Sequence, residues 1–342
     1  MSHDTLAIIW FGLWGLIWTV YFILDGYTLG TGMLFPFIAK NRQERNQLQE
    51  AVGPFWGGNE VWLITAGGAT FAAFPAVYAD MFSFLYTPLF LVLIALFIRA
   101  IGLEFMHKDD NPLWQATCKW GFFTGSFLIA FLFGVTFANL YRGLLIGPNG
   151  YEGNLFSLLN GYGILGGWLF VSLFLLSGSL WIQLKTAGQT AVRAYRFSKI
   201  LAGVAPAMLS LFFLATVNRT PLLNNYSENP VLWIVPVIAL TAMLASAYFI
   251  FKKKIGYAFT AVCVTIFTKM AFGFVGMFPN MLPSSIDNAY SLTLFNAAGS
   301  KLNLTIMFIV AAIFVPIIIV YQSWSYTLFK DKILKDSAKG YQ

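Results

Sequence analysis

Residues 6–30 read LAIIWFGLWGLIWTVYFILDGYTLG, and Asp25 is the only charged residue among them. A helix needs about 20 predominantly apolar residues to cross the hydrocarbon core of a bilayer. This run is long enough for that, and it exceeds the apolar region of roughly 7–15 residues in a secretory signal. We therefore expect it to be a retained membrane-spanning helix.

The rest of the chain has the same apolar character. Of its 342 residues, 58% are hydrophobic and 10% are charged, whereas an average soluble domain carries about 25% charged residues. This composition excludes a soluble enzyme, a disordered protein and a nucleic-acid binder. It predicts an all-α integral membrane protein, because helices satisfy their own backbone polar groups within lipid.

Nine segments are apolar enough to span the membrane, and we treat them as one polytopic domain over residues 1–342. They cover roughly residues 5–37, 52–74, 80–103, 117–141, 156–184, 198–217, 230–251, 255–279 and 303–329. The connecting loops are too short for a soluble domain. Any chemistry is therefore expected within the helix bundle, at its edges or on a partner.

Basic residues predict the orientation, because cytoplasmic loops carry an excess of Lys and Arg. Of the 21 Lys and Arg, 17 fall on one side of the predicted spans: Lys40, Arg42, Arg45, Arg99, Lys108, Lys119, Lys185, Arg193, Arg196, Lys199, Lys252, Lys253, Lys254, Lys330, Lys332, Lys335 and Lys339. The opposite loops carry Arg142, Arg219 and Lys301. The sequence thus predicts an N-terminus outside the cell and a C-terminus in the cytoplasm.

The residues that bind cofactors are scarce. His3 falls in the external tail and His107 in a cytoplasmic loop, so neither histidine is predicted at membrane depth, where a buried haem needs its ligands. Cys118 and Cys263 lie in apolar stretches and are interpreted as buried small residues. The chain contains no Walker A sequence and no H-E-x-x-H motif. We expect this chain to bind no metal or haem.

Four charged residues near the cytoplasmic side are informative, because ionisable side chains are costly in lipid. At about 1.5 Å per residue, Asp25 and Glu60 fall in the cytoplasmic half of the first two spans. Arg99 and Glu104 end the third span, so Asp25, Glu60 and Arg99 are predicted to share one layer. Two interpretations remain open: a charge-balanced cluster that joins three helices, or a path that relays cytoplasmic protons through Asp25 and Glu60.

Lys269 is a separate case. It lies about 14 residues into the eighth predicted span, near the middle of the membrane. At that depth an amine requires a partner, a water molecule or deprotonation. We treat Lys269 as an intramembrane charge of unassigned role.

Five strings are specific enough to indicate a family. They are DGYTLGTGML (25–34), PFWGGNEVWLITAGGA (54–69), FAAFP (71–75), FIRAIGLE (97–104) and GMFPNMLPSS (276–285). Together they resemble subunit II of the cytochrome bd-type quinol oxidases, and the resemblance extends over nearly the whole chain.

The resemblance implies a respiratory complex of a bacterial or archaeal plasma membrane. Such a complex oxidises membrane quinol, reduces dioxygen to water and builds a proton-motive force without a pump. The resemblance also implies that subunit I holds the haems, of types b and d, and that a small single-span third subunit is present. For this chain it implies two four-helix bundles plus one peripheral helix, support of subunit I, and proton conduction toward the haems.

The family-like positions in this chain are Asp25, Trp56, Asn59, Trp62, Arg99 and Glu104. Many members read W-D-G-N-Q where this chain reads Trp56-Gly57-Gly58-Asn59-Glu60. The aspartate, a proton-path candidate in those members, is Gly57 here, and the glutamine is Glu60. Since residues three apart lie on nearly the same face of a helix, Glu60 is a proton-path hypothesis specific to this chain.

An ion-coupled secondary transporter is the alternative function. Asp25, Glu60 and Lys269 would then couple an ion to a solute. That fold predicts inverted repeats with broken helices at mid-membrane. The sequence shows no pair of interrupted spans in matching halves, so we favour the oxidase subunit.

Overall fold

A computed structural model describes residues 1–334 of the chain. Its helices are α1 (His3–Ile38), α2 (Arg42–Ala73), α3 (Pro75–Phe84), α4 (Tyr86–Glu104), α5 (Pro112–Arg142), α6 (Leu155–Leu158), α7 (Gly161–Lys185), α8 (Gln189–Arg219), α9 (Asn224–Glu228), η1 (Pro230–Trp233), α10 (Ile234–Phe251), α11 (Ile255–Met277), η2 (Asn288–Tyr290), α12 (Leu294–Ala297) and α13 (Lys301–Leu328). Its strands are β1 (Ile146–Gly147), β2 (Gly150–Tyr151), β3 (Asn280–Leu282) and β4 (Leu292–Thr293). Lys335 and Lys339, which contribute to the predicted orientation, lie outside the described residues.

The predicted all-α membrane architecture is confirmed, since eight helices are long and apolar enough to cross a membrane among the described residues. They are α1, α4, α5, α7, α8, α10 together with η1, α11 and α13. The ninth predicted span corresponds to α2, whose first two turns are polar. The helix begins at Arg42, about ten residues before the predicted span, because the Asn41 side chain accepts a hydrogen bond from Glu44 N at 2.9 Å. The count of nine therefore remains a prediction.

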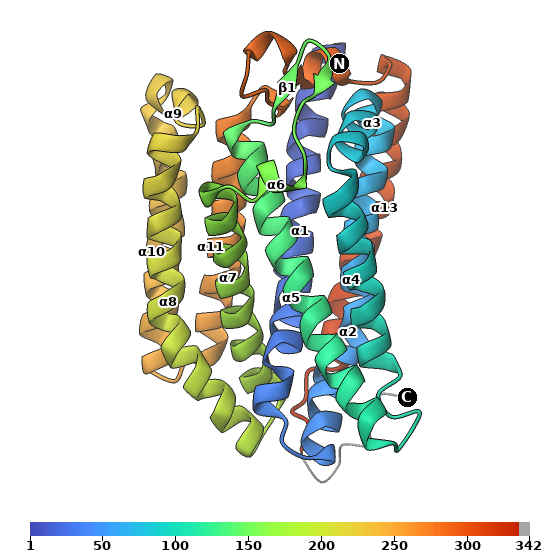
Figure 1. Cartoon of the computed structure of the whole chain (residues 1–342), viewed down its shortest axis with the longest axis vertical. Helices are drawn as coiled ribbons and strands as arrows, with labels where there is room; N and C mark the ends of the chain where they lie inside the picture. Colours follow the sequence, from blue (N-terminus) through green and yellow to red (C-terminus); the bar gives the residue numbers. More distant parts are fainter. Residues whose placement is uncertain (335–342) are drawn as a thin grey trace.

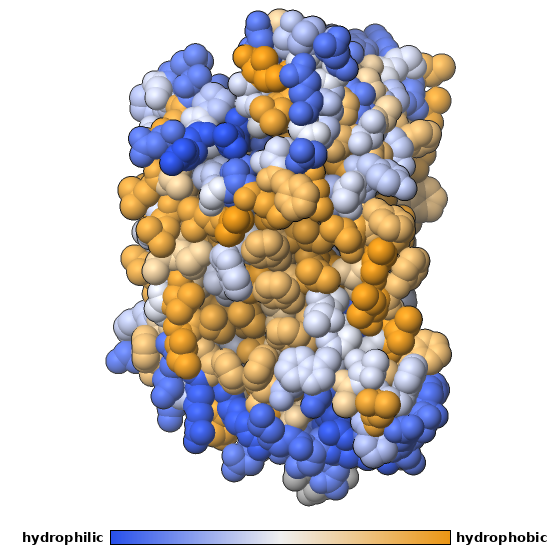
Figure 2. Space-filling view, viewed as in Figure 1, coloured by the Kyte–Doolittle hydropathy of each residue, from blue (hydrophilic) through white to orange (hydrophobic). Residues whose placement is uncertain are grey.

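The long helices run along one common direction (Figure 1). α1 packs against α2, α5, α7, α11 and α13, and therefore lies at the centre of the molecule. α8 and α10 lie at the left of the view and α13 at the right. Figure 2 shows a hydrophobic belt around the middle of this face, with hydrophilic residues above and below it, as expected of a protein that crosses a bilayer.

Two predicted spans are divided near their outer ends. The predicted span 80–103 is interrupted at Leu85, between α3 and α4. Pro88 in the first turn of α4 has no N–H to offer to the preceding turn, which accounts for a break at this point. The predicted span 156–184 contains the short helix α6 and then α7, which begins after its N-cap Asn160.

The closest helix contact lies between α1 and α7. A Cβ atom added at Gly30 would lie 1.8 Å from the carbonyl oxygen of Phe174, and one added at Gly178 would lie 2.4 Å from the carbonyl carbon of Gly30. The two backbones therefore touch, as small residues permit in membrane bundles. No larger residue fits at either position without separating the helices.

We predict that Gly30→Ala destabilises the protein, by about 1–3 kcal/mol, because its methyl group overlaps a backbone carbonyl that cannot move away. The control is Gly12→Ala in the same helix, where a Cβ meets nothing within 4 Å and the substitution favours the helix. Thermal unfolding of the purified complex measures both. Equal midpoints for the two variants would contradict the packing argument.

Candidate functional site

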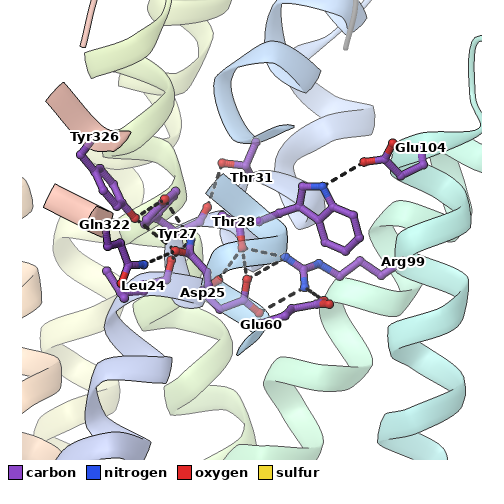
Figure 3. Close-up of polar contacts among 12 residues, drawn as sticks. Leu24, Asp25, Tyr27, Thr28, Thr31, Glu60, Arg99, Glu104, Gln322 and Tyr326 are labelled. Atoms are coloured by element: carbon purple, nitrogen blue, oxygen red, sulfur yellow. Dashed lines mark hydrogen bonds and ion pairs between the residues drawn. The ribbon is translucent and has the colours of Figure 1, made fainter. Parts of the chain in front are cut away.

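A buried ion pair joins α1 to α4. Arg99 Nη2 donates to Asp25 Oδ1 at 2.8 Å, and Arg99 Nη1 donates to Asp25 Oδ2 at 3.1 Å. Both side chains are fully buried. The two-pronged geometry is the arrangement in which a guanidinium binds a carboxylate most strongly. It fixes the relative height of the two helices (Figure 3).

The same guanidinium also holds α2 and a hydroxyl of α1. Arg99 Nη1 donates to Glu60 Oε1, while Arg99 Nη2 donates to Thr28 Oγ1 at 2.7 Å. Thr28 lies three residues after Asp25 and donates to the backbone oxygen of that residue at 2.9 Å. The site therefore contains two carboxylates around one guanidinium. Glu60 is the partly exposed member of this cluster, with 22% of its side chain exposed.

Trp56 and Glu104 extend the cluster toward the C-terminal end of α4. Trp56 Nε1 donates to Glu104 Oε1 at 2.9 Å, and the Arg99 guanidinium lies 5.9 Å from the centre of the Trp56 ring. Trp56 and Glu60 lie four residues apart on one face of α2, so the indole stands between the two carboxylates. Figure 3 shows Glu104 and Glu60 on either side of Arg99.

A second polar group lies on the other side of α1 and includes α13. Asn59 Nδ2 donates to the backbone oxygen of Leu24 and to the Tyr27 hydroxyl, both at 2.9 Å. The two phenols of Tyr27 and Tyr326 are 2.7 Å apart. Trp62 Nε1 donates to Gln322 Oε1 at 2.9 Å. This uncharged network attaches α13 to α1 and α2 and leaves the charged cluster to one side (Figure 3).

The two histidines lie at opposite ends of the bundle. His3 Nε2 lies 3.0 Å from the backbone oxygen of Gly299 at the end where α1 begins, while His107 follows α4 and contacts the amide oxygen of Gln49. Burial lowers the pKa of His107 from its ordinary value, and the nearby Arg42 and Arg45 lower it further. Two such distant histidines cannot bind the two faces of one haem.

Lys269 does not join the charged cluster. Its Nζ lies 4.4 Å from the ring centre of Phe170, 4.9 Å from that of Tyr141 and 5.2 Å from that of Phe212, and 1% of the residue is exposed. Within residues 1–334 it forms no ion pair. Three aromatic faces, which attract cations, therefore surround it in place of a carboxylate.

The structure thus brings Asp25, Glu60 and Arg99 into direct contact and leaves Lys269 apart. Sequence reasoning missed Thr28, Tyr27, Gln322 and Tyr326. Thr28 was recognisable as the residue one helical turn after Asp25. Gln322 and Tyr326 were recognisable as hydrogen-bonding residues four apart, and therefore on one face of the last helix.

Comparison with known proteins identifies relatives over almost the whole chain. The family model described as cytochrome bd terminal oxidase subunit II matches residues 6–329. Cytochrome bd-I ubiquinol oxidase subunit 2 of Escherichia coli K12 is 32% identical, over 98% of this chain and 97% of that protein. Cytochrome bd ubiquinol oxidase subunit 2 of Bacillus subtilis is 35% identical, over 97% and 96%.

A solved structure of bd oxidase from Geobacillus thermodenitrificans contains a chain of the same fold. Its TM-score is 0.74 at 16% identity, and the match covers 95% of this chain and 98% of that chain.

We predict that Arg99→Met lowers the stability of the protein by about 3–5 kcal/mol, because it leaves two buried carboxylates without their cation. Arg42→Gln is the matched control. The Arg42–Asp110 pair has 55% and 76% of its side chains exposed, so its loss costs at most about 1 kcal/mol.

Thermal unfolding of the purified complex again supplies the measurement. Adding Asp25→Asn and Glu60→Gln to Arg99→Met removes the uncompensated charge and is expected to recover part of the loss. If the triple variant is as unstable as Arg99→Met alone, the charge argument is wrong.

Proposed function

Because the chain belongs to the cytochrome bd terminal oxidase subunit II family, we propose that it supports the haem-bearing subunit of a quinol oxidase and delivers cytoplasmic protons toward it. Members of this family are subunits of a quinol oxidase complex, and their partner is subunit I. The chain is accordingly a multi-pass protein of the plasma membrane. Membership of this family favours an oxidase subunit over the alternative function, an ion-coupled secondary transporter.

The observation that carries the proton role is the unequal number of charges in the buried cluster. Asp25 and Glu60 share the single guanidinium of Arg99. When all three are ionised, the cluster has one excess negative charge within the membrane, and one proton neutralises it. Such a charge is costly in lipid. The two carboxylates can therefore take up and release one proton between them, while Arg99 stays positively charged.

Glu60 is the group that we assign to carry this proton. Asp25 is fully buried and bound by both prongs of Arg99, whereas Glu60 shares one prong and is partly exposed. Polar residues lead from the cytoplasmic end toward it: Glu104 contacts Trp56, and Gln49 Nε2 donates to the Leu103 backbone oxygen at 2.9 Å. Protons drawn from the cytoplasm to make water would add to the proton-motive force without a pump.

The exposed face of α2 is the surface that we assign to subunit I. Cβ atoms added at Gly57, Gly58, Gly67 and Gly68 would meet nothing within 4 Å, so a partner helix can approach the α2 backbone closely. Glu60 opens onto this same face. A partner that covers it would shield Glu60 from lipid and receive its proton directly. The small single-span third subunit stays a prediction from the resemblance.

We predict that Glu60→Gln lowers quinol oxidase turnover of the assembled complex by about 10²-fold, because an amide cannot take up and release a proton. Asp25→Asn is expected to lower it less, since Asp25 mainly positions Arg99. Oxygen consumption per haem measures turnover and corrects for assembly. Wild-type turnover and pH dependence in Glu60→Gln would exclude the relay.

Two further variants sharpen this test. Gly57→Asp added to Glu60→Gln returns a carboxyl about one helical turn away on nearly the same face, and is expected to restore part of the turnover. Asp110→Asn neutralises an exposed carboxylate outside the cluster and is expected to leave turnover unchanged. A purely structural cluster would show no rescue by Gly57→Asp.

We also predict that this chain, purified alone, gives no haem bands in a reduced-minus-oxidised spectrum, because its histidines lie at opposite ends of the bundle. The complex isolated from native membranes should show b- and d-type bands contributed by subunit I. Stoichiometric haem in the isolated chain would overturn this division of roles.

A further inference from the structure

Two arginines converge on one cavity at the end of the bundle where α1 begins. The cavity has a volume of about 300 Å³ and lies between the ends of α5, α7 and α8. Arg142 ends α5 and Arg219 ends α8. Leu165 of α7 and Ala215 of α8 form its apolar wall.

Basic residues are rare at this end. The loops predicted to lie outside carry only Arg142, Arg219 and Lys301, so two of these three cations line the same cavity. Both arginines are exposed, and within residues 1–334 neither forms an ion pair. Two neighbouring cations repel each other, and no carboxylate of the described residues offsets this repulsion through an ion pair.

The arginines, and not the start of α7, supply the positive character of this cavity. The backbone N–H groups of Tyr162 and Gly163 already donate to Asn160 Oδ1 at 3.1 and 3.0 Å. The two guanidiniums keep their donors available. Guanidinium groups bind phosphate oxygens through paired hydrogen bonds.

Below the cavity the surface is apolar. Leu211 and Leu214 of α8 and Trp168 of α7 are exposed, by 51%, 64% and 48%. In Figure 2 the hydrophilic residues of this end lie directly above the hydrophobic belt. The cavity therefore occupies the level of lipid headgroups, with an apolar surface for an acyl chain beneath it. α8 lies on the opposite side of the molecule from α13 (Figure 1).

We propose that the cavity between Arg142 and Arg219 binds a phosphate-bearing anion, with an anionic phospholipid of the outer leaflet as its source. The phosphodiester accepts hydrogen bonds from both guanidiniums, and an acyl chain lies along α7 and α8. This lipid bridges the ends of α5 and α8 and neutralises the two charges. Free phosphate shares the headgroup chemistry but lacks the acyl chain.

The test is native mass spectrometry of the intact oxidase complex with added phosphatidylglycerol, and with phosphatidylcholine as the zwitterionic comparison. Arg142→Gln with Arg219→Gln is expected to weaken phosphatidylglycerol binding at least about tenfold, which corresponds to about 1.4 kcal/mol. Lys301→Gln removes the third outer cation away from the cavity and should leave binding unchanged. The haem spectrum of each variant shows that the complex has assembled.

A second arm adds inorganic phosphate in excess over the lipid. Retention of phosphatidylglycerol identifies the lipid as the source, whereas displacement of the lipid by phosphate identifies the free anion and overturns the lipid assignment. Equal phosphatidylglycerol binding by the double variant and by Lys301→Gln would overturn the site itself. Equal binding of phosphatidylcholine and phosphatidylglycerol would do the same.

Discussion

The bidentate ion pair between Asp25 and Arg99 is the contact on which this fold depends. Both side chains are fully buried, so each charge is stable there only because the other is present. Their contact sets the heights of α1 and α4, and Arg99 Nη1, which also binds Asp25, adds Glu60 of α2. The charged layer thus assembles three helices that apolar packing alone would leave free to slide. Because two carboxylates meet one cation, the same layer that organises the bundle is also suited to hold a proton.

Lys269 and Arg99 show two ways of placing a cation in a membrane bundle. Arg99 is compensated by full charges from two other helices, whereas Lys269 lies among the rings of Tyr141, Phe170 and Phe212. An aromatic environment supplies partial negative charge but no proton acceptor. This side chain of α11 therefore contacts α5, α7 and α8 through their aromatic rings. The carboxylates paired with Arg99 lie instead on the α1–α2–α4 side of the molecule.

Much of the helical architecture could be predicted from the sequence, because the length of an apolar segment is a local property. The orientation derived from the basic residues stays a prediction. The meeting of Asp25, Glu60 and Arg99 followed from their depths alone. The break at Leu85 was missed, because apolar residues on both sides of it conceal the effect of Pro88. The contacts of Gln322 and Tyr326 with Asn59 were also missed, since they depend on how the last helix packs against the first two. The aromatic surroundings of Lys269 come from three separate helices, and no spacing along the chain reveals them.

The contact between Gly30 and Gly178 has a consequence for how this chain can change in length. Gly30 is docked against the α7 backbone, and Asp25 lies five residues earlier in the same helix. One inserted residue between them would turn the helix by about 100°, which would carry the carboxylate away from Arg99 while the glycine stayed in place. The length of this segment therefore sets the position of the Asp25 carboxylate relative to the backbone contact of Gly30. Insertions and deletions are tolerable in the loops that connect the helices, but the five-residue interval is fixed.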